Sequence, residues 1–118
     1  MRFVLFTYPD PAFAATWLEI DAAEREAEID RHRDWFARHG EKVAGGEELA
    51  WPIRARTVRR HQGEPVVTDG PFIESKEILG GFIVLDVADM DEATAIAADW
   101  PSLRHPGSAV QVQAVGAD

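Results

Sequence analysis

His32 is the residue whose type and position are best suited to chemistry. It lies on a stripe that Ile29, Phe36 and His39 continue at helical spacing, so we expect its ring to face inward. Glu28 precedes it by four residues, and residues four apart meet on one helix face. A carboxylate beside an imidazole fixes the tautomer and leaves the other ring nitrogen as a base near neutral pH. His32 is therefore a candidate catalytic base, or else a histidine at the core edge that bonds a backbone carbonyl.

Asp69 is the second candidate, a carboxylate directly before Gly70 and Pro71 in a tight turn. An Asp in such a turn usually bonds the backbone two residues further on. The alternative is that its carboxylate points into a cavity and orients His32, which would make the two residues a catalytic pair. In that case a hydrogen bond, direct or through one water, joins the side chains and keeps them closer than about 8 Å.

The loop after this turn holds three candidate substrate-binding residues, Phe72, Glu74 and Lys76. Phe72 follows a proline and either plugs the core or forms the apolar wall of a pocket. Glu74 and Lys76 either form an exposed ion pair, which stabilises little, or contact a ligand. In an enzyme, Lys76 would stabilise the negative charge that develops during the reaction.

Composition argues against several classes of site and partner. The chain of 118 residues has no cysteine, which excludes disulfides and thiolate chemistry. Its formal net charge of −9 disfavours nucleic acid and anionic membranes as partners, and no apolar run is long enough to span a bilayer. His32 and His39 lie about 10.5 Å apart along a helix, too far for one metal ion. No nucleotide-binding motif occurs either. We expect no metal, no cofactor and a cytoplasmic protein.

The basic residues gather in one short stretch of the chain, at Arg54, Arg56, Arg59, Arg60 and His61. Positive charge on an edge strand prevents unwanted pairing with other strands, which explains the cluster without any partner. An anionic substrate or an acidic protein partner is the alternative.

Two helices and several strands must hold these candidates in place. Asp21 and Asp89 each open a D-x-x-E capping signal, so a helix should begin at each. The dipeptide Gln62-Gly63 predicts a hairpin turn between two short strands. The other strands are expected at Phe3 to Tyr8, Lys42 to Trp51, Gly81 to Val87 and Val110 to Val115.

This order predicts an α+β fold, a ferredoxin-like protomer with an inserted β-hairpin, in a single domain over residues 1–118. Two helices cover only one face of such a sheet, yet the first strand and the strand at Phe82 are apolar on both faces. A second copy of the sheet is the simplest cover for the other face. We therefore expect a homodimer whose sheets pack face to face around a shared interior.

The segment from Val67 to Val87 reads V-T-D-G-P-F-I-E-S-K-E-I-L-G-G-F-I-V-L-D-V. It resembles the D-G-P-F-x-E-[ST]-K-E-x-x-G-G-F signature of the YCII-related family, in its DGPF-type branch, and the likeness extends over most of the chain. The resemblance implies a dimeric α+β barrel and a His on the first helix near the position of His32. It also implies kinship with a wider superfamily in which a few small-molecule enzymes use a His with a carboxylate partner.

Together these features predict a protein that binds a small organic molecule of unknown identity in an interior cleft. If it is an enzyme, the expected reaction is cofactor-independent proton transfer or elimination, with His32 as the base and Asp69 as its orienter. A non-catalytic ligand sensor is the alternative, as is a protein-interaction module that uses the basic stretch. Genes for similar proteins often lie beside alternative sigma factors, so the resemblance places both alternatives in a transcription-associated setting.

Overall fold

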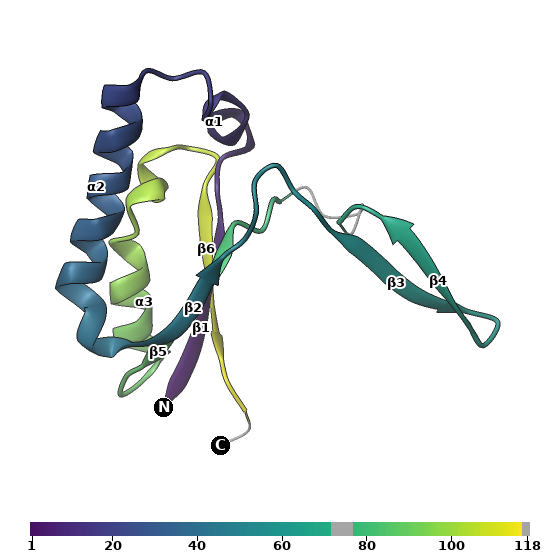
Figure 1. The fold of residues 1–118 in the computed structure, drawn as a ribbon. Helices are drawn as coiled ribbons and strands as arrows, with labels where there is room; N and C mark the ends of the chain where they lie inside the picture. Colours follow the sequence, from purple (N-terminus) through teal and green to yellow (C-terminus); the bar gives the residue numbers. More distant parts are fainter. Residues whose placement is uncertain (72–76, 117–118) are drawn as a thin grey trace.

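The computed structural model describes residues 1–71 and 77–116. Its elements follow one another along the chain as Figure 1 shows. They are β1 (Arg2–Tyr8), α1 (Pro11–Thr16), α2 (Ala22–His39), the 3-10 turn η1 (Gly40–Lys42), β2 (Val43–Glu48), β3 (Arg56–His61), β4 (Glu64–Asp69), β5 (Gly81–Asp86), α3 (Met90–Ala98), the 3-10 turn η2 (Pro101–Arg104) and β6 (Ala109–Ala114). No helix within the described part of the chain combines the length and apolar character needed to cross a membrane.

Four strands form one antiparallel sheet in the order β2-β5-β1-β6. This is the order of a ferredoxin-like βαββαβ layout, so the predicted fold class is confirmed. β3 and β4 form a separate two-stranded sheet inserted between β2 and β5. The insertion starts and ends at one place, because Leu49 donates its backbone N–H to the carbonyl of Gly80 at 2.8 Å, next to the paired Glu48 and Gly81.

The β2–β5 pairing contains a bulge that depends on a glycine. The register shifts between Val43 and Gly45, and Gly46 has a φ of 144°. A Cβ at Gly46 would collide with the backbone carbonyl of Phe82 and lie 2.9 Å from Cα of Ile83. Only glycine fits this close approach of two strands without strain.

The helices begin where the capping residues lie. The Asp21 carboxylate accepts the backbone N–H of Glu24 at 2.8 Å, and Asp89 accepts that of Glu92 at the same distance. Both predicted helices are therefore confirmed. α1 was not among the helices predicted from the sequence. Asp10 caps this single short helix and Pro11 stands in its first turn, where a missing N–H costs nothing.

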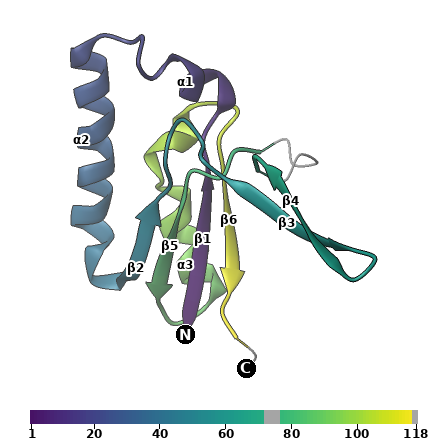
Figure 2. The same ribbon diagram turned by 45° about the vertical axis from the view of Figure 1, so that its right-hand side comes forward.

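The core lies between the sheet and the two long helices. Phe3 and Leu5 of β1, Leu85 of β5 and Trp35 of α2 are at most 1% exposed. Trp35 also donates its indole N–H to the carbonyl of Ile96 in α3 at 3.2 Å, which ties the helices together. Figures 1 and 2 show α2 and α3 on the same side of the sheet.

No helix in the described part of the chain covers the opposite side of the sheet (Figures 1 and 2). Val4 and Phe6 of β1 alternate with the buried residues and face this side, opposite Val84 and Phe82 of β5. All four are only half-buried in the single chain. We call these four residues the open face.

The inward side of α2 differs from the predicted stripe. Glu28 and Trp35 are its buried residues, His32 is half-buried, and Phe36 is 42% exposed. The predicted stripe through Ile29 and Phe36 is therefore wrong by about one residue of rotation. The reason is that Glu28, which a hydropathy pattern places in water, finds charged partners inside the fold.

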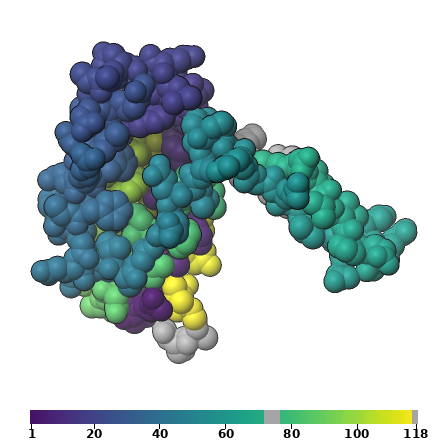
Figure 3. All heavy atoms as spheres, viewed as in Figure 1, coloured from purple at the N-terminus to yellow at the C-terminus, as the bar shows by residue number. Residues whose placement is uncertain are grey.

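β3 and β4 form a hairpin that stands away from the rest of the molecule (Figures 1 and 3). We call residues 54–69 the arm. Gln62 and Gly63 have φ values of 50° and 82°, which is the turn that a two-residue hairpin requires, so the predicted hairpin is confirmed. The radius of gyration is 16.2 Å, whereas a compact chain of this length has about 13.5 Å.

Candidate active site around Glu28 and His32

A buried carboxylate forms the centre of the candidate site. The Glu28 side chain is 4% exposed, yet it lies among cationic groups. Arg104 donates a hydrogen bond from Nη2 to Glu28 Oε2, and Arg31 Nη1 lies 3.4 Å from the same oxygen. The arginine side chains are about half-exposed. The buried carboxylate of Glu28 therefore contacts two cations that are themselves partly in water.

Two histidines approach the same carboxylate. His105 Nε2 lies 3.6 Å from Glu28 Oε2, and His32 Nδ1 lies 3.9 Å from Glu28 Oε1. Within the described residues, Glu28 Oε1 and His105 Nε2 are buried without a hydrogen-bond partner. A buried polar atom with no partner costs free energy, so this end of the carboxylate has capacity for another donor.

The surroundings of Glu28 affect its pKa in opposite directions. Burial raises the pKa, while the hydrogen bond and charge of Arg104 lower it, together with the charges of His32 and His105. The cationic groups prevail, so the pKa of Glu28 lies below its ordinary value. The carboxylate is therefore ionised at neutral pH and can stabilise a protonated histidine beside it.

His32 is held in one tautomer. Its Nδ1 lies 2.8 Å from the backbone carbonyl of Glu28, and a carbonyl only accepts, so we assign the ring proton to Nδ1. In the neutral ring, Nε2 then has a free lone pair and accepts the hydroxyl of Ser102 at 3.1 Å. The side chain is 27% exposed. The arrangement is that of a fixed imidazole base in contact with a hydroxyl group.

Three segments far apart in the sequence build this site. α2 places Glu28 and His32 one turn apart, and Pro101 ends the α3 region and starts η2, which brings Ser102 and Arg104 against α2. Two ring contacts fix the histidines: Phe13 of α1 stacks on His105 at 3.8 Å, and Trp100 meets His32 edge-on at 4.8 Å.

The predicted partner of His32 lies elsewhere. Asp69 ends β4, its side chain is 93% exposed, and its Oδ1 lies 3.3 Å from Nε of Arg56 across the arm. His32 lies on the helix side of the sheet, while the arm extends on the other side (Figures 1 and 2). One chain therefore does not bring the two side chains together, since both ring nitrogens of His32 contact Glu28 and Ser102. The three predicted substrate-binding residues Phe72, Glu74 and Lys76 lie outside the described residues.

Sequence reasoning missed the half of the site that η2 provides. Ser102, Arg104 and His105 were not among the candidates predicted from the sequence, yet all three lie against His32 or Glu28. The weak signal available was Pro101, which stops a helix just before a Ser, an Arg and a His.

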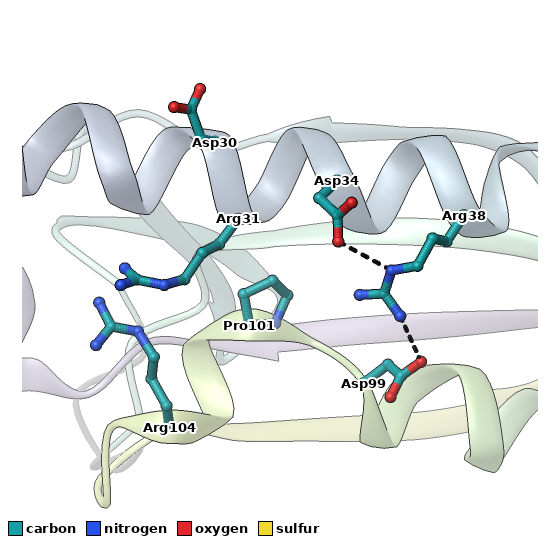
Figure 4. Close-up of a pocket in the computed structure, with 7 residues that line it drawn as sticks. All are labelled: Asp30, Arg31, Asp34, Arg38, Asp99, Pro101 and Arg104. Carbon is teal, nitrogen blue, oxygen red and sulfur yellow. Dashed lines mark hydrogen bonds and ion pairs between the residues drawn. The ribbon is translucent and has the colours of Figure 1, made fainter.

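An open groove lies beside this site, between α2 and the α3–η2 region. It has a volume of about 400 Å³ and is lined by Asp30, Arg31, Asp34, Arg38, Asp99, Pro101 and Arg104. Figure 4 shows Arg38 joined to Asp34 and Asp99 on one side, with Arg31 and Arg104 directed toward each other at the other end. His32 is not among the lining residues, so the two arginines form the link between the groove and the Glu28 cluster.

Comparisons with known proteins give the family. The model of the YCII-related domain matches residues 1–115. An uncharacterised protein of Rhizobium meliloti (strain 1021) is 33% identical over 99 residues, which cover 84% of this chain and 79% of that protein. Among solved structures, 5-chloro-2-hydroxyhydroquinone dehydrochlorinase (TftG) of Burkholderia phenoliruptrix AC1100, in complex with 2,5-dihydroxybenzoquinone, superposes with a TM-score of 0.56 at 13% identity over 100% of this chain and 96% of its own. At that identity the likeness shows a shared fold. The chain therefore belongs to the YCII-related family.

Proposed function

We propose that this protein binds a small organic molecule and acts on it by cofactor-independent proton transfer or elimination, with His32 as the base. The observation that carries the proposal is the fixed tautomer of His32, whose Nε2 lone pair accepts the Ser102 hydroxyl at 3.1 Å. The ionised carboxylate of Glu28, 3.9 Å from Nδ1, also supports the proposal, because it would stabilise the ring once it is protonated.

The proposed step uses groups that are present in the chain. His32 Nε2 takes a proton from a C–H or O–H bond of the substrate, directly or through the Ser102 hydroxyl. The electron pair of that bond either stays as an anion or forms a double bond while a leaving group departs with its own electron pair. The imidazolium ion that results is stabilised by the ionised Glu28.

The two arginines favour an anionic substrate. Arg31 and Arg104 share the single charge of Glu28 and are 46% and 44% exposed, so they can also bind a carboxylate or phenolate from solvent. The solved relative with the same fold acts on a chlorinated hydroxyhydroquinone, which supports this substrate class only by analogy of fold. Asp69 as orienter, Phe72 as a pocket wall, Glu74 as a ligand contact and Lys76 as a charge stabiliser stay predictions. A contact between Asp69 and His32 would have to come from a second chain.

The test begins with mass spectrometry of small molecules retained by the purified protein, with 2,5-dihydroxybenzoquinone as a first binding probe. Turnover of each bound compound is then compared in the wild type, in His32→Gln and in His61→Gln, the last being a control on the exposed arm. Loss of general-base catalysis should lower turnover by roughly 100-fold or more in His32→Gln alone. Equal turnover in all three proteins would refute the assignment of His32.

A ligand sensor is the second candidate, because the half-buried Ser102–His32 contact could bind a ligand without breaking a bond in it. A sensor returns its ligand intact after long incubation, whereas an enzyme converts it. Ligand recovered unchanged, bound more weakly by His32→Gln, would support the sensor.

We also propose that two copies pair through their open faces. Phe6 and Phe82 lie opposite each other there with no helix over them (Figure 2), and an apolar sheet face of this kind is normally covered by another layer. Phe82→Asp should convert a dimer into a monomer in light scattering at micromolar concentration. Leu18→Asp, at a site 76% exposed, should leave the dimer intact; a monomeric wild type would contradict the proposal.

A further inference from the structure

We propose that the arm docks on the body of a second copy of this chain, that is, on its four-stranded sheet and helices. In the dimer, the arm of each protomer then packs against the other protomer. The inference rests on the proposed pairing of open faces but adds a separate contact with its own residues. Its basis is the exposure, the charge and the direction of the arm.

The arm carries an exposed apolar patch on one face. Val58 and Val67 lie opposite each other with Pro65 beside them, and the same face holds Arg60 and the Arg56–Asp69 ion pair. Val58 is 64% exposed and Val67 58% exposed. A two-stranded hairpin alone in water is at best marginally stable, so this face needs a surface to pack on.

Among residues 1–71 and 77–116, its own body does not provide that surface. Hydrogen bonds hold the arm at its base, from the N–H of Gly70 to the carbonyl of Ala55 and from the hydroxyl of Thr57 to the carbonyl of Gly70. Beyond this base the arm projects into solvent (Figure 3), and every residue of β4 is exposed.

Charge identifies the second copy as a suitable partner. The arm contains four arginines and two carboxylates, a formal charge of +2. The rest of the chain then holds eight Lys or Arg and nineteen Asp or Glu, a formal charge of −11. A basic arm is attracted to the acidic body of another copy, while two bodies alone repel each other.

Direction completes the argument. The arm extends on the side of the sheet opposite to α2 and α3, which is the side of the open face (Figures 1 and 2). A copy that covers the open face therefore lies within reach of the arm. In a two-fold dimer the same contact occurs twice, because each copy offers the same surface.

Photo-crosslinking with isotope mixing tests the contact directly. Val58 is replaced by p-benzoylphenylalanine, equal amounts of ¹⁴N- and ¹⁵N-labelled protein are mixed, and crosslinked peptides are identified by mass spectrometry. The same substitution at Glu26, on the exposed side of α2, is the control. We expect arm–body peptide pairs of mixed isotope from position 58 only. The mixture is denatured and refolded before irradiation so that subunits exchange; arm–body pairs of a single isotope alone, or no arm–body pair while the dimer persists, would then overturn the proposal.

Dimer affinity tests the role of charge. Arg60→Glu should raise the dimer dissociation constant roughly tenfold at low salt, and the difference should shrink when the Debye length falls to about 3 Å at 1 M salt. Val58→Asp should weaken the dimer at both salt concentrations. The control Arg33→Glu makes the same charge reversal on α2, at a side chain that is 70% exposed, and should change the dissociation constant little. If Phe82→Asp abolishes the dimer while both arm variants match the wild type, the pairing of open faces stands and the arm contact is refuted.

Discussion

Replacing Glu28 by glutamine tests the charged cluster at the centre of the candidate site. The substitution keeps the size of the side chain but removes the negative charge that Arg104 and Arg31 contact. It also places an amide next to His32 and His105, where the carboxylate has an oxygen without a hydrogen-bond partner among the described residues. The structure therefore predicts that removing the single charge of Glu28 lowers the free energy of unfolding.

The size of the loss follows from burial. Breaking a fully buried ion pair costs about 3–5 kcal/mol, but both arginines are nearly half-exposed and can regain water. The relevant figure is then that of a hydrogen bond to a charged group, about 1.5–3 kcal/mol. We expect Glu28→Gln to lose about 2 kcal/mol of unfolding free energy, which corresponds to a Tm lower by roughly 8 °C.

Urea unfolding at one fixed protein concentration measures this loss, since any dimer would otherwise change the apparent stability. Glu26→Gln is the matched control, because Glu26 lies on the same helix with a side chain 62% exposed, and should change the free energy by less than about 0.5 kcal/mol. If Glu28→Gln behaves like this control, the cluster does not stabilise the fold and the reasoning fails.

The pH dependence gives an independent check. The pKa of Glu28 is lowered in the folded chain from an ordinary value of 4.5. Its stabilisation is therefore complete above pH 4.5 and disappears as the pH falls through the lower, folded value. The stability difference between the wild type and Glu28→Gln should therefore narrow as the pH falls below 4.5. A difference that widened below pH 4.5 would contradict the direction of the pKa shift.

Two further substitutions test the frame that holds the site. Trp35→Ala should lose about 3–5 kcal/mol in urea unfolding, because Trp35 is fully buried and bonds Ile96; Leu18→Ala, at an exposed site, serves as its control. Gly46→Ala should lose about 2 kcal/mol or more through backbone strain and overlap with β5. Gly45→Ala, with open space around its Cβ, should be nearly neutral, and equal losses at both glycines would dismiss the bulge argument.

The fold could be predicted from the sequence because the helix caps and the hairpin turn are determined by short stretches of residues, and these agree with the order of the elements in the fold. Asp21 and Asp89 cap the two long helices, and Gln62-Gly63 closes the hairpin. These signals act within a few residues. The family motif that ends in β5 pointed to the same fold. α1 escaped detection because six residues around a proline give no periodic pattern.

The candidate site could be predicted only in part. His32 was identified from its position on α2, but its partner Ser102 lies seventy residues further along the chain. Glu28 was expected to meet the ring through its carboxylate, whereas the hydrogen bond comes from its backbone carbonyl at 2.8 Å. Burial of a charged residue depends on cations that the fold supplies from η2, and no pattern within one helix contains that information.

Residues 50–79 leave the sheet after Leu49, directly past β2, and rejoin it at Gly80, directly before the neighbouring strand β5. This has a consequence for how the sequence of this insertion can vary in the family. Since the backbones of Leu49 and Gly80 are joined by a hydrogen bond, the register of β2 against β5 does not depend on the sequence of the segment inserted between them. Such an insertion can grow, shrink or change its composition while the scaffold keeps its shape. Relatives could therefore carry insertions of different length or sequence between β2 and β5 without any change in the candidate site on the helix side of the sheet.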